Sequence, residues 1–84
     1  MATANFVYSD YSNGESHFFH IENSDNTFLN NSVVEARCDD NGQVVSFHDV
    51  KRGNKYVHPE IVNELMGACN LDETVLEYNS NNVY

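Results

Sequence analysis

Two Asn-Gly dipeptides, Asn13-Gly14 and Asn41-Gly42, constrain the fold of this chain most strongly. Each lies between two runs in which apolar and polar residues alternate, and the four runs are residues 4–10, 16–22, 32–38 and 43–50. Alternation is typical of a strand with one buried face, and Asn-Gly between two such runs is the strongest short-range signal for a β-hairpin. We therefore expect two β-hairpins in the first two thirds of the chain.

The apolar spacing changes after residue 58 from that of a strand to that of a helix. Pro59 suits the first helical turn, where its missing N–H is not needed, and apolar residues then recur at helical spacing as far as Cys69. We expect a helix over about 59–69. Residues 55–57, which precede it, fit a short fifth strand that pairs back on the second hairpin.

The C-terminal segment has two interpretations. Residues 72–78 fit either a short helix or an edge strand, and we favour the helix because Asp72 can cap it and its first turn is acidic. Residues 79–84 are expected to form a loose tail.

Together these patterns predict a single small α+β domain over residues 1–84. An antiparallel sheet of four to five strands, from residues 3–57, is expected to be covered on one face by the helix. In the first run, Ala4, Phe6 and Tyr8 are expected on one face of the sheet. The predicted core consists of Phe6, Phe19, Val34, Val45, Phe47, Ile61, Leu65 and Met66.

Thirteen acidic side chains against four basic ones give the chain a formal net charge of -9. A surface of one sign repels itself and costs compactness, so it is more often associated with a partner or with solubility than with folding. Three of the four bases, Lys51, Arg52 and Lys55, lie close together in the sequence, around a predicted turn. The sequence therefore predicts a dipolar molecule, with one basic turn on an acidic body.

The first residues contain neither a basic segment nor the apolar stretch of a secretory signal. No run approaches the ~20 apolar residues of a membrane-spanning helix. We expect a cytoplasmic protein without membrane association. In that compartment the two cysteines, Cys38 and Cys69, are expected to be reduced thiols rather than a disulfide.

The histidines and cysteines do not have the spacing of a metal site. The candidate ligands are His17, His20, His48, His58, Cys38 and Cys69. His17 and His20 are three residues apart on a predicted strand and so point to opposite faces, and neither Cys-x-x-Cys nor His-x-x-x-His occurs. We expect no metal and no cofactor, and Cys69 is interpreted as a small buried apolar residue of the helix.

The sequence also contains no catalytic motif that we recognise. It has no Gly-rich phosphate loop and no Gly-x-Ser-x-Gly, and its acids are dispersed rather than paired for hydrolysis. A cysteine nucleophile would need His48 or His58 beside it, an arrangement that the sequence leaves open. We expect a protein without enzyme activity.

A surface rich in carboxylates can occupy a groove built for phosphates, because a basic groove attracts negative charge from either source. Glu60 and Glu64 lie one helical turn apart, roughly 6 Å along the axis, which is near the separation of neighbouring phosphates. The chain is therefore interpreted as a DNA mimic. The acids expected to contact a partner are Glu35, Asp39, Asp40, Glu60, Glu64, Asp72, Glu73 and Glu77, and the aromatic anchors are Tyr8, Tyr11, Tyr56 and Tyr78.

In general character the chain resembles the small acidic inhibitors encoded by phages and mobile elements, such as anti-CRISPR and anti-restriction proteins, although no motif carries the likeness. The resemblance implies an inhibitor that binds a basic nucleic-acid-binding protein or complex and blocks its DNA- or RNA-binding surface, in the host cytoplasm if the chain is phage-encoded. Two alternatives are an immunity protein that neutralises a nuclease toxin and an accessory or structural phage or regulatory subunit.

Direct binding of nucleic acid is a further alternative. The basic turn, with Tyr56 next to Lys55, has the residue types for phosphate contact and base stacking. Three bases are few against a net charge of -9, so we expect no direct contact with nucleic acid. The sequence leaves monomer and homodimer open.

Overall fold

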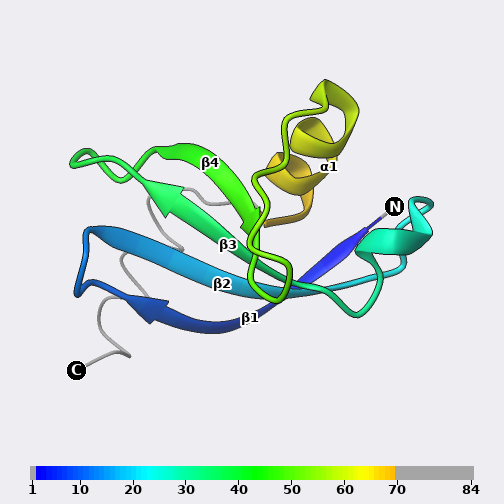
Figure 1. Ribbon diagram of the computed structural model, residues 1–84, viewed down its shortest axis with the longest axis horizontal. Coiled ribbons are helices and arrows are strands. Elements are labelled where there is room, and N and C mark those ends of the chain that lie inside the picture. Colours follow the sequence, from blue (N-terminus) through cyan, green and yellow to red (C-terminus); the bar gives the residue numbers. More distant parts are fainter. Residues whose placement is uncertain (1, 70–84) are drawn as a thin grey trace.

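Each of the two Asn-Gly turns closes a β-hairpin, and the hairpins join into one antiparallel sheet (Figure 1). Gly14 and Gly42 have φ values of 94° and 80°, which a residue without a Cβ adopts at little cost. The predicted α+β fold, an antiparallel sheet with one packed helix, is confirmed. The strands are β1 Thr3–Asp10, β2 Glu15–Glu22, β3 Val33–Cys38 and β4 Val44–Asp49, in the order β1-β2-β3-β4.

The computed structural model describes residues 2–69 of the chain. The expected helix or strand at 72–78 and the expected loose tail at 79–84 lie outside the described residues. Within residues 2–69, none of the helices combines the length and the apolar character that spanning a bilayer requires.

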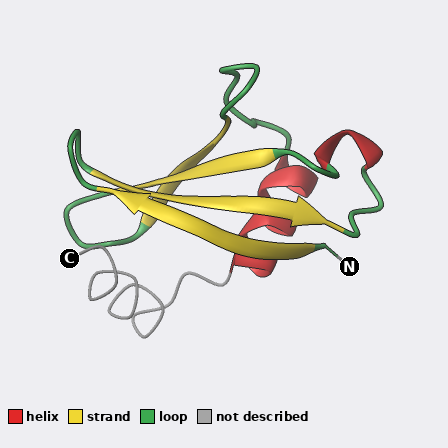
Figure 2. Ribbon diagram, turned by 90° about the horizontal axis from the view of Figure 1, so that it is seen from below, coloured by secondary structure: helices red, strands yellow, loops and turns green. Residues whose placement is uncertain are grey.

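The helix α1 Pro59–Cys69 has the predicted bounds and covers one face of the sheet (Figure 2). Ile61, Leu65 and Cys69 recur every four residues on its buried side. The helix lies toward the end of the sheet that holds the N-terminus, away from the two Asn-Gly turns (Figure 1). The core between helix and sheet also contains Ala2, Phe19, Ile21, Leu29, Val34, Ala36, Phe47 and Tyr56.

A register shift in β1 overturns the expectation that Phe6 and Tyr8 share a face. Phe6 pairs with Phe19, but Tyr8 pairs with Phe18, because the register between β1 and β2 shifts between Phe6 and Tyr8. Neighbouring residues of β2 point to opposite faces, so their partners do as well. The bulge therefore leaves Phe6 on the helix-covered face and moves Tyr8 to the other face.

Five of the eight predicted core residues are buried. The prediction is wrong for Phe6, Val45 and Met66, whose exposed fractions are 39%, 62% and 47%. Phe6 lies on β1, an edge strand of the sheet. Val45 lies at the start of the other edge strand, beside a second register shift at Cys38. Met66 directly follows Leu65 and so lies off the buried side of α1. In each case the local pattern is apolar, but the position in the fold leaves the side chain partly open to solvent.

The predicted fifth strand is reduced to one bridge, between His48 and Lys55, followed by a hydrogen bond from the Tyr56 N–H to the Phe47 carbonyl at 2.9 Å. Tyr56 is buried, and its hydroxyl donates to Asp49 Oδ2 at 2.9 Å. This contact fixes the basic turn against the end of β4. The connection between β2 and β3 contains a short 3-10 helix, η1 Thr27–Leu29.

Candidate functional site

The two Asn-Gly turns lie at the same end of the sheet (Figure 1). Their positions bring together Asp10 and Glu15, which flank the first turn, and Asp39 and Asp40, which belong to the second. We call these four residues the acidic hairpin end. The basic turn at 51–54 follows β4 and therefore lies at the other end of that strand. Lys51, Arg52 and Lys55 thus lie apart from the acidic hairpin end.

Hydrogen bonds within the turns hold two of these carboxylates. Asp10 Oδ1 accepts from the backbone N–H and the hydroxyl of Ser12, at 2.9 and 2.7 Å, and these bonds lower the pKa of Asp10. Asp39 Oδ1 accepts from the backbone N–H groups of Asn41 and Gln43, at 2.9 and 3.0 Å. Both carboxylates are therefore oriented by the turns, and Asp10 is ionised at neutral pH.

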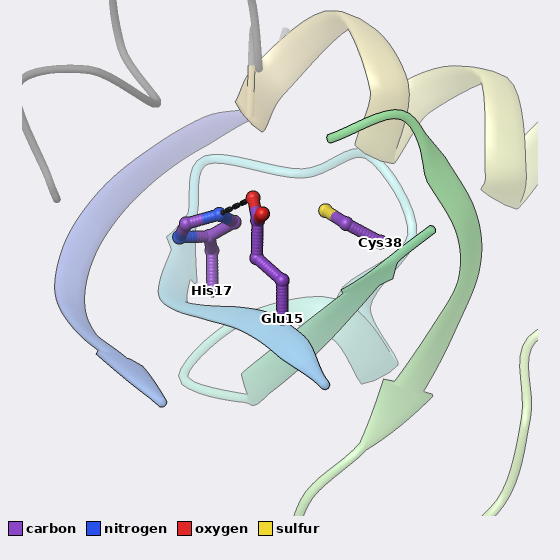
Figure 3. Close-up of side chains that lie close together, drawn as sticks. All are labelled: Glu15, His17 and Cys38. Atoms are coloured by element: carbon purple, nitrogen blue, oxygen red, sulfur yellow. Dashed lines mark hydrogen bonds and ion pairs between the residues drawn. The ribbon is translucent and has the colours of Figure 1, made fainter. Parts of the chain in front are cut away.

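A cluster of potential metal ligands lies at this end of the sheet, with side chains from β2 and β3 (Figure 3). Glu15 and His17 are two residues apart on β2 and so share a face, while Cys38 of β3 is the direct cross-strand partner of Glu15. One ligand atom from each residue lies within 4.8 Å of the other two. His17 is fully buried, whereas Glu15 and Cys38 are partly exposed.

The imidazole of His17 is held at both nitrogens. Nε2 lies 2.6 Å from Glu15 Oε2, and Nδ1 lies 2.6 Å from the Ser9 hydroxyl. A carboxylate only accepts, so Nε2–H donates to Glu15, whereas the Ser9 hydroxyl is able to donate to or accept from Nδ1. The ring of Tyr11 meets the imidazole edge to face, with centroids 6.0 Å apart. These contacts fix the plane of the imidazole.

Both cysteines are protonated at neutral pH. Burial, together with the charges of Glu15 and Asp39, raises the pKa of Cys38 to about 12. Burial also raises the pKa of Cys69 to about 12. The thiolate is the nucleophilic form, so neither side chain is activated for covalent catalysis. Cys69 packs in the core, in keeping with its interpretation as a small apolar residue.

Comparison with known protein families, with curated proteins and with solved structures finds no significant match. A function is therefore inferred from the described side chains alone.

Some acids predicted to contact a partner are instead engaged within the fold. Glu35 lies on the sheet face opposite α1, where it accepts from the Ser16 hydroxyl at 2.7 Å and pairs with Arg37 Nε at 3.2 Å. Its charge is offset by the guanidinium. Asp40 and Glu60 are exposed, as a contact role requires.

Glu64 joins the helix to the connection between β2 and β3. Its two carboxylate oxygens accept from the Ser24 hydroxyl at 2.7 Å and from the Asn26 amide at 2.8 Å. The predicted pair of Glu60 and Glu64 is therefore divided, because one carboxylate faces solvent and the other anchors a loop.

The predicted aromatic anchors also separate. Tyr8 is 49% exposed and stacks on Phe18, with ring centroids 4.3 Å apart. Tyr11 is half-buried beside His17, and Tyr56 belongs to the core. Of these anchors, Tyr8 best fits a surface contact. The remaining predicted contact residues, Asp72, Glu73, Glu77 and Tyr78, lie outside the described residues.

The cluster of Glu15, His17 and Cys38 was not predicted. The expectation of no metal rests on the spacing of histidines and cysteines along the chain, which does not include carboxylate ligands. The Glu-x-His spacing at residues 15–17 is a local signal, because both side chains share one strand face. The position of Cys38 beside Glu15 depends on the register between the two hairpins, and the spacing of residues along the chain does not give that register.

Proposed function

We propose that this chain is a non-enzymatic binding protein whose acidic hairpin end occupies a basic, nucleic-acid-binding surface of a partner protein. The observation that carries the proposal is the position of both hairpin turns at one end of the sheet, away from the basic turn (Figure 1). A partner approaching this end meets Asp10, Asp39 and Asp40, while Glu15 beside them is hydrogen-bonded to His17.

Electrostatic attraction is the means by which this surface would bind a basic partner. Several carboxylates on one side of a small protein attract a basic surface over a distance, which raises the association rate, and they compete there with phosphates. Asp10 and Asp39 are oriented by hydrogen bonds within their turns, so binding does not have to order those side chains. Tyr8, stacked on Phe18, adds an exposed aromatic on the face opposite the helix.

The non-enzymatic part of the proposal is supported by the state of the two cysteines and by the burial of the Ser9–His17 pair. Both thiols are protonated at neutral pH, and Ser9 and His17 are buried. An anti-defence inhibitor and an immunity protein would use the same surface against different targets. The gene neighbourhood separates them, because an immunity gene lies beside the gene of its toxin.

The test is capture of the partner from a host lysate, followed by association kinetics with the purified partner. The structure selects Asp40→Lys with Asn41→Lys as the variant, since both side chains are exposed at the tip of the second turn. We expect this variant to slow association about tenfold or more, and excess duplex DNA or RNA to compete with the wild type.

The matched control is Glu60→Lys with Asn63→Lys, which makes the same change of charge at two exposed positions of α1. We expect a much smaller effect on the association rate from this control. Equal slowing by both variants would mean that net charge, rather than the acidic hairpin end, governs binding. No competition by nucleic acid would rule out the blocking mechanism.

A further inference from the structure

The cluster on β2 and β3 contains one oxygen, one nitrogen and one sulfur ligand. Glu15, His17 and Cys38 converge from two neighbouring strands, with their ligand atoms within 4.8 Å of one another (Figure 3). A tetrahedral ion with bonds of about 2.0 to 2.3 Å places its ligand atoms about 3.3 to 3.8 Å apart. The separations in the cluster are close enough for small side-chain rotations to reach that geometry.

We propose that Glu15, His17 and Cys38 bind one Zn²⁺ ion through a carboxylate oxygen, an imidazole nitrogen and a thiolate. The ligand types select the metal, because thiolate and imidazole suit Zn²⁺, whereas Mg²⁺ and Ca²⁺ take oxygen ligands. The carboxylate and the thiolate together carry two negative charges, which balance the charge of the ion. This inference does not require the partner proposed above, although Glu15 belongs both to the cluster and to the acidic hairpin end.

Ser9 is the positioning residue for the imidazole. Without metal, Nε2 lies 2.6 Å from Glu15 Oε2 and Nδ1 lies 2.6 Å from the Ser9 hydroxyl, which is able to donate to or accept from the ring. When Nε2 binds the ion, the ring proton is on Nδ1, where it donates to the Ser9 oxygen. The Cys38 thiol proton is released to solvent. One hydroxyl thus supports both tautomers without a change of fold.

Two of the three ligands are open to solvent, because Glu15 and Cys38 are partly exposed. Three protein ligands leave the fourth tetrahedral position for water. The ionised carboxylate of Asp10, exposed at the same end of the sheet, adds negative potential, which favours a cation.

The first experiment titrates Zn²⁺ into the reduced full chain by calorimetry and uses Co²⁺ as a spectroscopic probe. We expect one ion per chain, and a thiolate-to-cobalt charge-transfer band that Zn²⁺ displaces. Cys38→Ser should abolish the band, and Cys69→Ser, the matched change at the core cysteine, should keep it. Absence of binding to the wild type, or a band that survives in Cys38→Ser, would overturn the site.

The second experiment compares the Zn²⁺ affinity of variants at the proposed ligands with that of variants at neighbouring residues. Glu15→Gln should weaken Zn²⁺ binding at least tenfold, whereas Glu22→Gln, an exposed acid at the far end of β2, should leave it unchanged. Ser9→Ala should weaken binding about 10- to 100-fold while the cobalt band remains, as expected for a positioning residue. Circular dichroism confirms that each variant is folded. Equal loss in both glutamate variants would refute the assignment.

Discussion

Asp49 organises the turn that follows β4 through a single buried carboxylate. It is 3% exposed, and it accepts from the Arg52 N–H at 2.7 Å and from the Tyr56 hydroxyl at 2.9 Å. Burial by itself raises the pKa of Asp49, but these hydrogen bonds outweigh burial and lower it. The ionised carboxylate is therefore more stable in the folded protein than in the unfolded chain.

The lowered pKa of Asp49 predicts acid sensitivity. Its contribution to stability is present above the ordinary carboxyl pKa of about 4 and is lost as the pH falls through the lower, folded pKa. We expect Asp49→Asn to reduce the free energy of unfolding most at neutral pH. Below about pH 5, the free energy of unfolding of the variant should fall less steeply than that of the wild type. Urea unfolding at a series of pH values measures this.

The control for this prediction is Asp25→Asn, which removes an exposed carboxylate in the connection between β2 and β3. It should keep the pH dependence of the wild type. If the free energy of unfolding of Asp49→Asn and that of the wild type fell equally with pH, the role of Asp49 would be contradicted.

At the scale of elements, signals within one segment predicted the turns and the helix. The burial of individual side chains depends on contacts between elements. Pro59 and the spacing up to Cys69 act within one segment, so the helix has the expected bounds. Whether Phe6 is covered depends on a bulge and on the place of β1 at the sheet edge. Tyr56 was expected to contact a partner, but its side chain packs in the core and its hydroxyl bonds to Asp49, which the pairing of residues 55–57 does not by itself indicate.

Two neighbouring residues of α1 test the packing of the helix. Leu65 is fully buried, whereas Met66 is 47% exposed. We expect Leu65→Ala to lower the free energy of unfolding by about 2–5 kcal/mol, because it leaves a cavity in the core. Met66→Ala should cost less than about 1 kcal/mol. Thermal and urea unfolding measure both, and similar costs would show that the helix faces the sheet differently.

The two glutamates of α1 test the link between the helix and the connection from β2 to β3. Glu64→Ala removes the acceptor for Ser24 and Asn26, and we expect it to cost about 1–2 kcal/mol. Glu60→Ala makes the same substitution at an exposed site and should change stability by about 0.5 kcal/mol or less. Urea unfolding compares them. An equal effect would mean that the link adds no stability.

For the whole molecule, the antiparallel order of the strands brings acids that are scattered in the sequence to one end of the sheet. The fold class and the separate basic turn were predicted from the sequence. The acidic hairpin end was not, because grouping its four residues requires two hairpins side by side in one sheet. The same requirement hid the proximity of Cys38 to Glu15 and His17.

The acidic hairpin end predicts how binding of the proposed partner responds to salt. Screening shortens from about 30 Å at 0.01 M to about 8 Å at 0.15 M ionic strength. We expect the association rate to fall about tenfold or more over that range, while the dissociation rate changes far less. Stopped-flow or surface-bound kinetics measure both rates. A salt-independent association rate would leave the acidic surface with a role in solubility only.

β1 is an edge strand of the described sheet, so one row of its backbone N–H and C=O groups faces away from β2. A regular row of this kind is a template on which further chains can add strand after strand, as in amyloid. The extra residue at the bulge breaks the two-residue repeat of the row between Phe6 and Tyr8. An incoming strand matched to the first half of β1 is out of step in the second half. The bulge thereby opposes fibril growth at an edge that exposes Phe6 and Val7.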